Sequence, residues 1–390
     1  MIRGRWTPAD RAASIYQELP FEVPAGVPAV SVRLRYDRSR AVLDLGLFDP
    51  EGFRGWSGGA REGFVVTPER ATPGYLPGPL PAGEWRVLLG LHRVPADGVE
   101  YEVEISTGAA EPEPEPAPPP RPERPPRREL PAAEGRRWLA GDLHTHTVHS
   151  DGGLTVHQLA CLARSRGLDY LAVTDHNTTS HHAVLPAAAA HAGILLVAGF
   201  ELTTDRGHAN CLGPDRWIDF RRPAEEWLTD SEAAGGLLSI NHPVDGEMSW
   251  RHPLRGRPPF VEIWHTSWDR YAPAPFEWWE AWGAGVPIGG SDFHRTGDLP
   301  PGWPTTWLEV EDDDVLGALR AGRIAISAGP DGPVLVRHDG ELVVLEGEGA
   351  TLVGPDGARR RIEAPRVRVP AAEGTYRLVA DDGLALALTP

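Results

Sequence analysis

The sequence predicts an α/β protein in which a βα repeat is flanked by β-rich segments, and three observations indicate this class. Residues 132–330 alternate apolar, strand-like runs with helix-like stretches, as in LAGDLHTH, TVHQLACLARSRG and DYLAVTDH. Residues 1–110 and 331–390 consist of short strand-like runs divided by glycine and proline. A proline-rich run separates the first β-rich segment from the repeat.

Residues 1–110 are expected to form an all-β domain of the sandwich or jelly-roll type. Runs such as VSVRLRYD, AVLDLGLFD, GEWRVLLGLH and VEYEVEIST favour strands, and clusters such as TPGYLPGPLPAG favour the turns between them. Several short strands at this spacing are typical of small sandwiches. We interpret the domain as a structural or lid element, with a ligand-binding module as the alternative.

Residues 111–131 are expected to form an extended linker. Ten of these 21 residues are proline, a residue that lacks a backbone donor and favours polyproline II. At about 3.1 Å per residue, such a segment spans roughly 60 Å as a semi-rigid spacer. A ligand for a proline-binding module is the alternative interpretation.

Residues 132–330 carry the βα repeat, and its connections imply a mostly parallel sheet or a barrel. The chain then returns to a β texture in PVLVRHDG, ELVVLEG, TYRLVADD and LALALTP. We therefore expect residues 331–390 to form a small β appendage.

The composition excludes several classes of protein. Among 390 residues, 38 are basic and 55 are acidic, which gives a formal net charge of −17. This balance disfavours a grip on long nucleic acid or on anionic membranes, since both need a basic surface. Two cysteines, Cys161 and Cys211, are too few for a disulfide framework and fit a reducing compartment. Because the first residues also lack the apolar run of a signal peptide, we expect a cytoplasmic protein.

Histidines concentrate in the βα repeat, where 13 of the 15 lie between His144 and His294. The informative ones follow predicted strands, whose ends converge on one face of a βα barrel, where active sites form. His144 and His146 stand two residues apart, so both point to one face of a strand, and Asp292 and His294 do the same. The full set of candidates comprises His144, His146, Asp151, His176, Glu201, His208, His242, Asp292 and His294.

Imidazoles together with carboxylates suit zinc, manganese or iron. Nine such residues exceed what one ion needs, so with a bridging carboxylate they suit two or three ions. A single HxH or DH pair is a weak signal, whereas the ordered set HxH, D, DH, E-x6-H, NHP and SDxH is highly specific.

Three further residues are candidates for contact with a substrate. His265 ends a strand-like run and is interpreted as a proton donor, a substrate contact or a support for the ligands. Arg206 and Arg295 lie close in sequence to the expected ligands and are candidate phosphate contacts, with solvated surface positions as the alternative. Trp264 and Trp268 flank His265 and are expected to line an aromatic pocket.

These motifs resemble those of the polymerase and histidinol phosphatase (PHP) superfamily of metal-dependent phosphoesterases. DLHTHTVHSDG is similar to the first family motif, and TDHN, the Glu201 segment with His208, NHP and SDFH follow in the family order. The resemblance covers about residues 138–330 and implies a distorted (β/α)7 barrel with a trinuclear metal site. The N-terminal β domain is more weakly similar to the carbaryl-hydrolase-like (CehA/McbA) branch, whose named members cleave a carbamate ester.

The resemblance also implies a place for each ligand. The first metal would take His144, His146, Glu201 and Asp292. The second would take Glu201 as a bridge together with His208 and His242. The third would take Asp151, His176 and His294.

The implied reaction is hydrolysis of a small phosphate monoester or diester, nucleotides and short oligonucleotides included, by a metal-bound hydroxide. A carboxyl-ester or carbamate hydrolase with the same metals is the alternative. A non-catalytic regulatory module is disfavoured because all nine positions are occupied. The amidohydrolases that bridge metals through a carbamylated lysine are excluded, since the sequence contains no lysine. Nothing in the pattern indicates an oligomeric state.

Overall fold

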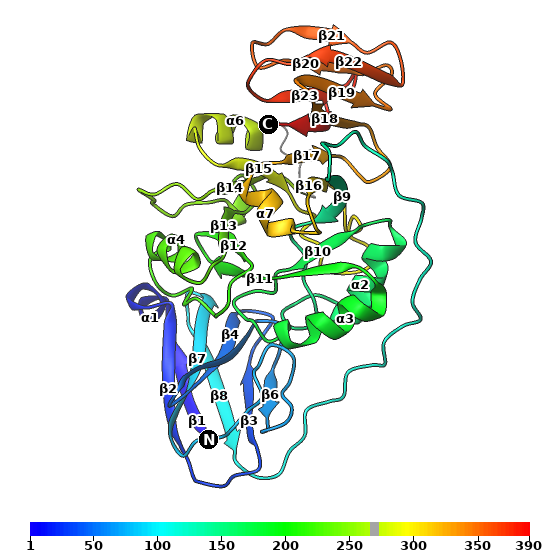
Figure 1. Cartoon of the computed structure of the whole chain (residues 1–390). Coiled ribbons are helices and arrows are strands. Elements are labelled where there is room, and N and C mark those ends of the chain that lie inside the picture. Colours follow the sequence, from blue (N-terminus) through cyan, green and yellow to red (C-terminus); the bar gives the residue numbers. More distant parts are fainter. Residues whose placement is uncertain (266–272) are drawn as a thin grey trace.

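In the computed structural model, which describes residues 1–265 and 273–390, the chain forms three regions that stack end to end (Figure 1). An N-terminal β region is followed by an α/β region and then by a C-terminal β region. The α/β region therefore has a β region at each end.

The N-terminal region is built from two antiparallel sheets that share one core. Its elements are β1 (Ile2–Trp6), α1 (Pro8–Ala13), β2 (Tyr16–Val23), β3 (Val30–Tyr36), β4 (Val42–Asp49), β5 (Gly52–Gly58), β6 (Gly63–Val66), β7 (Gly83–Arg93) and β8 (Val99–Ser106). The strand orders are β1-β8-β3-β6 and β2-β7-β4-β5. In β3, Val32 and Leu34 are buried whereas Arg33 and Arg35 are exposed, because successive side chains of a strand point to opposite faces.

The proline-rich segment 111–131 contains no helix or strand and runs along the outside of the α/β region (Figure 1). Arg124 and Arg127 both pair with Asp169, with nitrogen–oxygen distances of 2.7 and 2.8 Å. Arg128 donates to the carbonyl oxygens of Pro330 and Gly332. The arginines of this segment therefore fasten it to the α/β region.

The α/β region contains most of a mixed sheet, together with the helices that cover it. Its elements are β9 (Arg137–Asp142), α2 (Val156–Ser165), β10 (Tyr170–Val173), η1 (His182–Val184), α3 (Leu185–Ala192), β11 (Leu195–Thr204), β12 (Gly207–Leu212), α4 (Ala224–Ala233), β13 (Leu237–Ile240), η2 (Gly246–Met248), β14 (Phe260–Trp264), α6 (Ala274–Trp282), β15 (Val286–Gly289), β16 (Thr305–Val310), α7 (Val315–Arg320) and β17 (Ile324–Ser327). Helix α2 begins at a capping box in which Thr155 and Gln158 satisfy each other's backbone N–H groups.

Strand direction in this sheet is only partly parallel. β9, β10 and β11 are parallel neighbours, as are β13, β14 and β15, but β12 runs antiparallel to both of its neighbours and β16 antiparallel to β9 and β17. The sheet also curls, because the Thr306 hydroxyl of β16 bonds to the backbone of Gly289 in β15. The strand ends consequently turn toward a common centre.

The C-terminal region continues the sheet and adds a small one. It comprises β18 (Val334–His338), β19 (Glu341–Leu345), β20 (Thr351–Val353), β21 (Arg359–Arg361), β22 (Arg366–Pro370), β23 (Tyr376–Val379) and β24 (Ala385–Thr389). β24 pairs antiparallel with β17. Through this pair the large sheet runs β15-β14-β13-β12-β11-β10-β9-β16-β17-β24-β23-β20-β21, while β18, β19 and β22 form the separate sheet.

The N-terminal region packs on the α/β region through a continuous apolar core. Phe48 and Trp56 of the first region belong to the same buried cluster as Phe200, Phe220 and Trp227 of the second. Elsewhere at this boundary, the rings of Phe53 and Trp217 stack with their centroids 4.0 Å apart. The two regions are therefore held together by packing as well as by the connecting chain.

The predicted α/β class is confirmed, with extensive β-sheet on both sides of the central region. The sheet is less parallel than expected. Strand β12 lies antiparallel to β11, and β16 lies antiparallel to both β9 and β17. The boundaries proposed between domains stay predictions. No helix in the described part of the chain is long and apolar enough to cross a membrane.

Candidate metal centre

The first two histidines of the predicted set lie directly after β9. His144 and His146 are completely buried. Backbone hydrogen bonds of 2.9 Å, from Asp292 N–H to the His144 carbonyl and from His146 N–H to the Phe293 carbonyl, align the two segments. This pairing brings Asp292 Oδ1 to 3.2 Å from His144 Nε2 and to 3.0 Å from His146 Nε2.

Glu201, near the end of β11, lies at the centre of the set. Its Oε1 is 3.2 Å from His144 Nε2, 3.3 Å from His208 Nδ1 and 3.4 Å from His242 Nε2. Its Oε2 is 2.7 Å from His176 Nδ1. One buried carboxylate therefore faces four imidazoles from four segments. Burial alone would raise the pKa of Glu201, but the surrounding imidazoles hold it well below its usual value.

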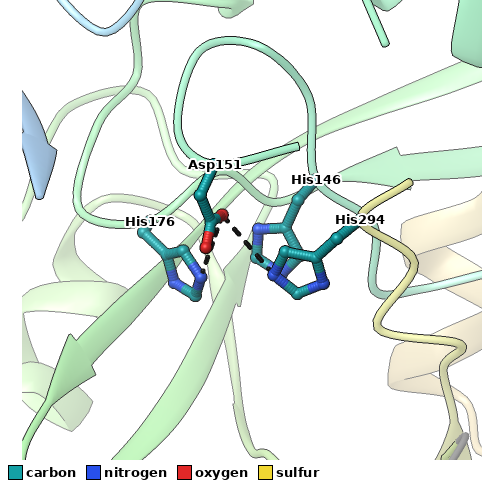
Figure 2. Close-up of side chains that lie close together, drawn as sticks. All are labelled: His146, Asp151, His176 and His294. Carbon is teal, nitrogen blue, oxygen red and sulfur yellow. Dashed lines mark ion pairs between the residues drawn. The ribbon is translucent and has the colours of Figure 1, made fainter. Parts of the chain in front are cut away.

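A second group gathers toward the N-terminal region (Figure 2). Asp151 Oδ1 lies 3.5 Å from His176 Nε2 and 3.4 Å from His294 Nε2. The His146 ring stacks against those of His176 and His294, at centroid distances of 4.3 and 4.2 Å, and the latter two lie 5.8 Å apart. Burial alone would raise the pKa of Asp151. The neighbouring His176 and His294 outweigh burial and bring this pKa below its usual value, so the carboxylate stays ionised.

The buried donors fit a metal better than they fit one another. His144 Nε2 and His208 Nδ1 are buried and make no hydrogen bond, although Glu201 Oε1 lies only 3.2–3.3 Å away. Two ligands of one ion, each about 2.1 Å from it at a tetrahedral angle, stand about 3.4 Å apart. The described residues contain four groups whose ligand atoms all lie within 4.8 Å of one another, and these groups could hold divalent cations. Their imidazole and carboxylate donors suit zinc, manganese and iron.

These four groups include every predicted ligand except Asp292 and add one residue that the sequence reasoning missed. They are His146, Asp151, His176 and His294; His144, His146 and Glu201; His144, His242 and Glu262; and Glu201, His208 and His242. Asp292 joins them through its distances to His144 and His146. All nine predicted residues thus lie together, while their roles as ligands remain a proposal.

The missed residue, Glu262 of β14, orients two of the histidines. Its completely buried carboxylate accepts from His144 Nδ1–H at 2.9 Å and from the His242 backbone N–H at 3.1 Å. The first bond leaves the lone pair of His144 Nε2 directed at Glu201 and Asp292, which is how a carboxylate supports a ligating histidine. The available signal was a charged residue inside the apolar run FVEIW, since a buried charge needs a partner.

A second missed carboxylate, Asp175, shapes the loop between His146 and Asp151. It accepts from the Thr147 backbone N–H, the Thr147 hydroxyl and the Ser150 hydroxyl at 2.6–2.8 Å. These bonds fold the loop back over the end of β10. The loop in turn presents Asp151 to the imidazoles of Figure 2.

The backbone at the centre adopts left-handed conformations that non-glycine residues seldom use. The φ angles are 25° at His242, 53° at Asp292 and 54° at Asn177, the neighbour of His176. Such residues persist where the surroundings fix them, and they cluster at functional sites. At Asn177 the side chain does this, because it exchanges hydrogen bonds with the backbone of Thr203 and so holds the end of β10 to β11.

The three predicted substrate contacts lie around the centre in different ways. His265 is buried, with its ring centroid 5.5 Å from that of His242. Burial, aided by His242, lowers the pKa of His265 to about 3, so this imidazole is neutral at pH 7. Arg206 and Arg295 are exposed, and Arg206 donates to the carbonyl of Arg251. Trp268 lies outside the described residues.

A cavity of about 380 Å³ opens onto the centre. Asp151, His176 and His208 line it on one side, and residues of the N-terminal region line it on the other. A larger cavity of about 830 Å³, between the proline-rich segment and β3, is lined by none of the nine predicted ligands. A substrate of the metal centre would therefore occupy the smaller cavity.

Comparison with known proteins places a family domain over this centre. Residues 142–248 match the model of the PHP domain family. The matched range contains seven of the nine predicted ligands, while Asp292 and His294 lie beyond it. A 3',5'-nucleoside bisphosphate phosphatase of Chromobacterium violaceum is 39% identical over 103 residues, which are 25% of this chain and 32% of that protein. The match thus spans about a third of that relative's length.

The solved structures that match this chain include two bacterial proteins of low sequence identity. A two-domain protein from Bacteroides vulgatus, described as containing a predicted PHP-like metal-dependent phosphoesterase, is 18% identical with a TM-score of 0.44. The alignment covers 69% of this chain and 99% of that one. An amidohydrolase from Chromobacterium violaceum is 20% identical with a TM-score of 0.34, over 48% of this chain and 97% of that one.

Proposed function

The chain contains a PHP domain at residues 142–248, and from this premise we propose that it is a metal-dependent hydrolase, namely a phosphoesterase acting on a small phosphate monoester or diester. The observation that carries the proposal is the meeting of imidazoles and carboxylates around Glu201. The phosphatase from Chromobacterium violaceum supports phosphate as the reacting group.

We assign the nine predicted residues to two or three divalent ions of zinc, manganese or iron. Glu201 would bridge two of the positions, because its two oxygens face imidazoles of different groups. When bound, such ions supply a Lewis acid and lower the pKa of water toward neutrality. Asp292 and Asp151 would then act as ligands, since their lowered pKa values keep both carboxylates ionised near pH 7.

His265 contributes as a neutral hydrogen-bonding group in this proposal. With a pKa of about 3 it holds no extra proton near pH 7. Its burial beside His242 places it at the edge of the ligand set. We therefore assign it to orienting a substrate oxygen, and not to delivering a proton as an imidazolium.

Phosphate recognition divides the main proposal from its alternative. Arg206 and Arg295 are exposed, and neither lines the 380 Å³ cavity. A neutral carboxyl ester or carbamate would need no arginine. The absence of both arginines from the cavity lining therefore supports a carboxyl-ester or carbamate hydrolase as the second candidate. If the substrate is a phosphate, the bound ions would hold most of its charge, since neither arginine lines the cavity.

The finer features of the prediction belong to the same proposal. We assign the curled sheet of the α/β region to a distorted (β/α)7 barrel. We assign the N-terminal β region to the type found in the carbaryl-hydrolase-like branch. The volume of the cavity suits a small molecule, since pockets for small ligands span about 300–1,000 Å³. We place the enzyme in the cytoplasm.

The experiment is a panel of p-nitrophenyl esters incubated with protein loaded with manganese or zinc. The panel holds a phosphate monoester, a phosphate diester, a carboxyl ester and an N-methyl carbamate. Glu201→Gln removes the central charge, and Glu232→Gln is the matched control because Glu232 is exposed on α4. The expected result is phosphate turnover that Glu201→Gln abolishes and Glu232→Gln preserves.

The other outcomes separate the candidates. Turnover confined to the carboxyl ester or the carbamate would favour the second candidate, and charge reversal at Arg206 and Arg295 would then leave the rate unchanged. Wild-type phosphate turnover in Glu201→Gln would contradict a centre built on Glu201. Metal-loaded protein that cleaves no member of the panel would contradict the hydrolase proposal.

A further inference from the structure

The N-terminal β region is docked firmly enough to shape the cavity over the metal centre. Besides the shared apolar core, the Gly74 backbone accepts from the Thr178 hydroxyl at 2.9 Å and donates to the Ser180 hydroxyl at 3.1 Å. Arg11 pairs with Asp205 at 3.0 Å. These contacts fix the β region against the loops that follow β10 and β11.

The cavity wall opposite the proposed ligands comes from this β region. Its lining residues there include Tyr16 of β2, Val42 and Asp44 of β4, Trp56 of β5 and His92 of β7. Tyr16 and Trp56 meet edge to face, with ring centroids 6.2 Å apart. The wall thus offers an aromatic and aliphatic surface that carries a carboxylate.

Asp44 differs from the other carboxylates of the cavity. Asp205 is paired with Arg11, and Asp151 faces imidazoles. Within residues 1–265 and 273–390, the Asp44 carboxylate makes neither an ion pair nor a hydrogen bond. Room is left for it by Gly90, where an added Cβ would lie 2.6 Å from Asp44 Oδ2.

The environment of Asp44 would stabilise a cation bound beside its carboxylate. Burial raises the pKa of this carboxyl to about 7, with His176 lowering it only in part. A carboxylate removed from water is stabilised by an opposite charge, and an aromatic neighbour adds attraction for the same cation. The Asp44 side chain lines the 380 Å³ cavity, together with Asp151, His176 and His208.

We propose that Asp44, with the aromatic wall of Tyr16 and Trp56, binds a positively charged amino group on the organic part of the substrate. This inference rests on the proposed function, because it places the ester at the metal centre and the organic group against the β region. The substrate class is then a small ester of an amine-bearing, largely apolar alcohol or phenol. Asp44 becomes a specificity residue supplied by a region distant in sequence from the ligands.

The test uses three phenyl phosphates of nearly equal size. Their para substituents are aminomethyl, hydroxymethyl and carboxymethyl, so that charge changes from positive to neutral to negative. The value of kcat/KM is measured for each with the full-length, metal-loaded protein at about pH 8.5, where a carboxyl with a pKa near 7 is ionised. Asp44→Asn and Asp44→Ala are compared with the wild type and with Asp97→Asn, a residue of the same region whose side chain is exposed and does not line the cavity.

The expected result is a preference of wild type and Asp97→Asn for the aminomethyl ester over the carboxymethyl ester. Asp44→Asn should lower the ratio of the two kcat/KM values by about tenfold, which corresponds to about 1.4 kcal/mol. Differences in metal loading cancel in the ratio within each variant, and differences in leaving-group reactivity cancel when the ratio of a variant is divided by that of the wild type. An unchanged ratio in both Asp44 variants would overturn the inference.

A binding measurement separates this inference from the proposed function. Calorimetric titration with 4-(aminomethyl)phenol and 4-(hydroxymethyl)phenol needs no turnover. Tighter binding of the amine, lost in Asp44→Asn, would support the inference even if none of the phosphates were cleaved and the phosphoesterase proposal fell. Phosphate turnover without preference for the amine would overturn the inference and leave the phosphoesterase proposal intact.

Discussion

Replacement of Glu262 should weaken metal binding although Glu262 was not among the expected ligands. Its carboxylate accepts from His144 Nδ1–H at 2.9 Å and from the His242 N–H at 3.1 Å. A hydrogen bond to a charged group contributes about 1.5–3 kcal/mol, against about 0.5–1.5 kcal/mol for a neutral one. Glu262→Gln keeps an acceptor oxygen but loses the charge, so each bond should lose about 1 kcal/mol.

The expected loss of metal affinity in Glu262→Gln is therefore about tenfold to hundredfold, since every 1.4 kcal/mol is a factor of ten. This range agrees with the usual effect of carboxylates that support ligating histidines. The assay is competition for zinc or manganese against a chromophoric chelator, with Glu232→Gln as the exposed control.

The pH dependence of the Glu262→Gln effect gives a second check. Burial lowers the pKa of His144, but the carboxylates of Glu262, Asp292 and Glu201 outweigh it and raise this pKa well above its usual value. Metal-free protein therefore holds a proton on His144 near pH 7, and a metal has to displace it. Because Glu262→Gln weakens that proton as well, the loss of affinity should be largest at about pH 8.5 and smaller at about pH 6.5. A variant that binds metal as tightly as wild type at both pH values would refute the reasoning.

Three further predictions follow from the same geometry. Removal of metal with a chelator should lower Tm by about 10 °C, because a ligand at about a thousand times its Kd contributes about 4 kcal/mol; an unchanged melting curve would mean that the buried charges need no cation. Metal affinity should rise between about pH 6 and pH 9, because a metal has to displace the proton of His176. Burial lowers the pKa of His176, but Asp151 and Glu201 outweigh burial and bring it to about 9. Metal titration in buffers across that range measures the affinity, and a flat profile would count against these ligands. Trp56→Ala should lower the free energy of unfolding by about 3–5 kcal/mol in urea denaturation, since Trp56 is buried against Tyr16 and Phe220; a loss below about 1 kcal/mol would show that this interface is dispensable.

Local spacing was enough to predict which residues meet at the centre. His144 and His146 share one face because every second side chain of an extended chain points to the same side. Asp292 lies beside them because the strand ends converge. Glu201 could be recognised as a bridge only through the family resemblance, and the structure gives that position a physical basis in the four imidazoles around it.

The remaining features depend on contacts that local patterns do not encode. The antiparallel direction of β12 follows from the tight turn after Thr204, which the alternation of apolar residues does not distinguish from a crossover. Glu262 reaches the His242 backbone because β14 lies beside β13 in the sheet, and that neighbour is set by tertiary packing. Asp44 reaches the cavity from a separate region, more than 100 residues away from Asp151 in the sequence, so no motif could link the two.

The proline-rich segment likewise combines a local feature that composition predicts with tertiary contacts that it does not predict. The segment, residues 111–131, forms neither helix nor strand, while its role as a linker stays a prediction. Its arginines, however, find Asp169 and the carbonyls of Pro330 and Gly332 on the surface of the α/β region. The segment is therefore attached to the α/β region through Arg124, Arg127 and Arg128, which its proline content does not predict.

The most direct test of the central claim is a crystal structure of metal-loaded protein with anomalous diffraction measured at the zinc or manganese edge. We expect two or three anomalous peaks about 3.5–4 Å apart, at least two of them in contact with the oxygens of Glu201. A single peak away from Glu201, or none in protein whose metal content is confirmed by mass spectrometry, would contradict a multinuclear centre built on these residues.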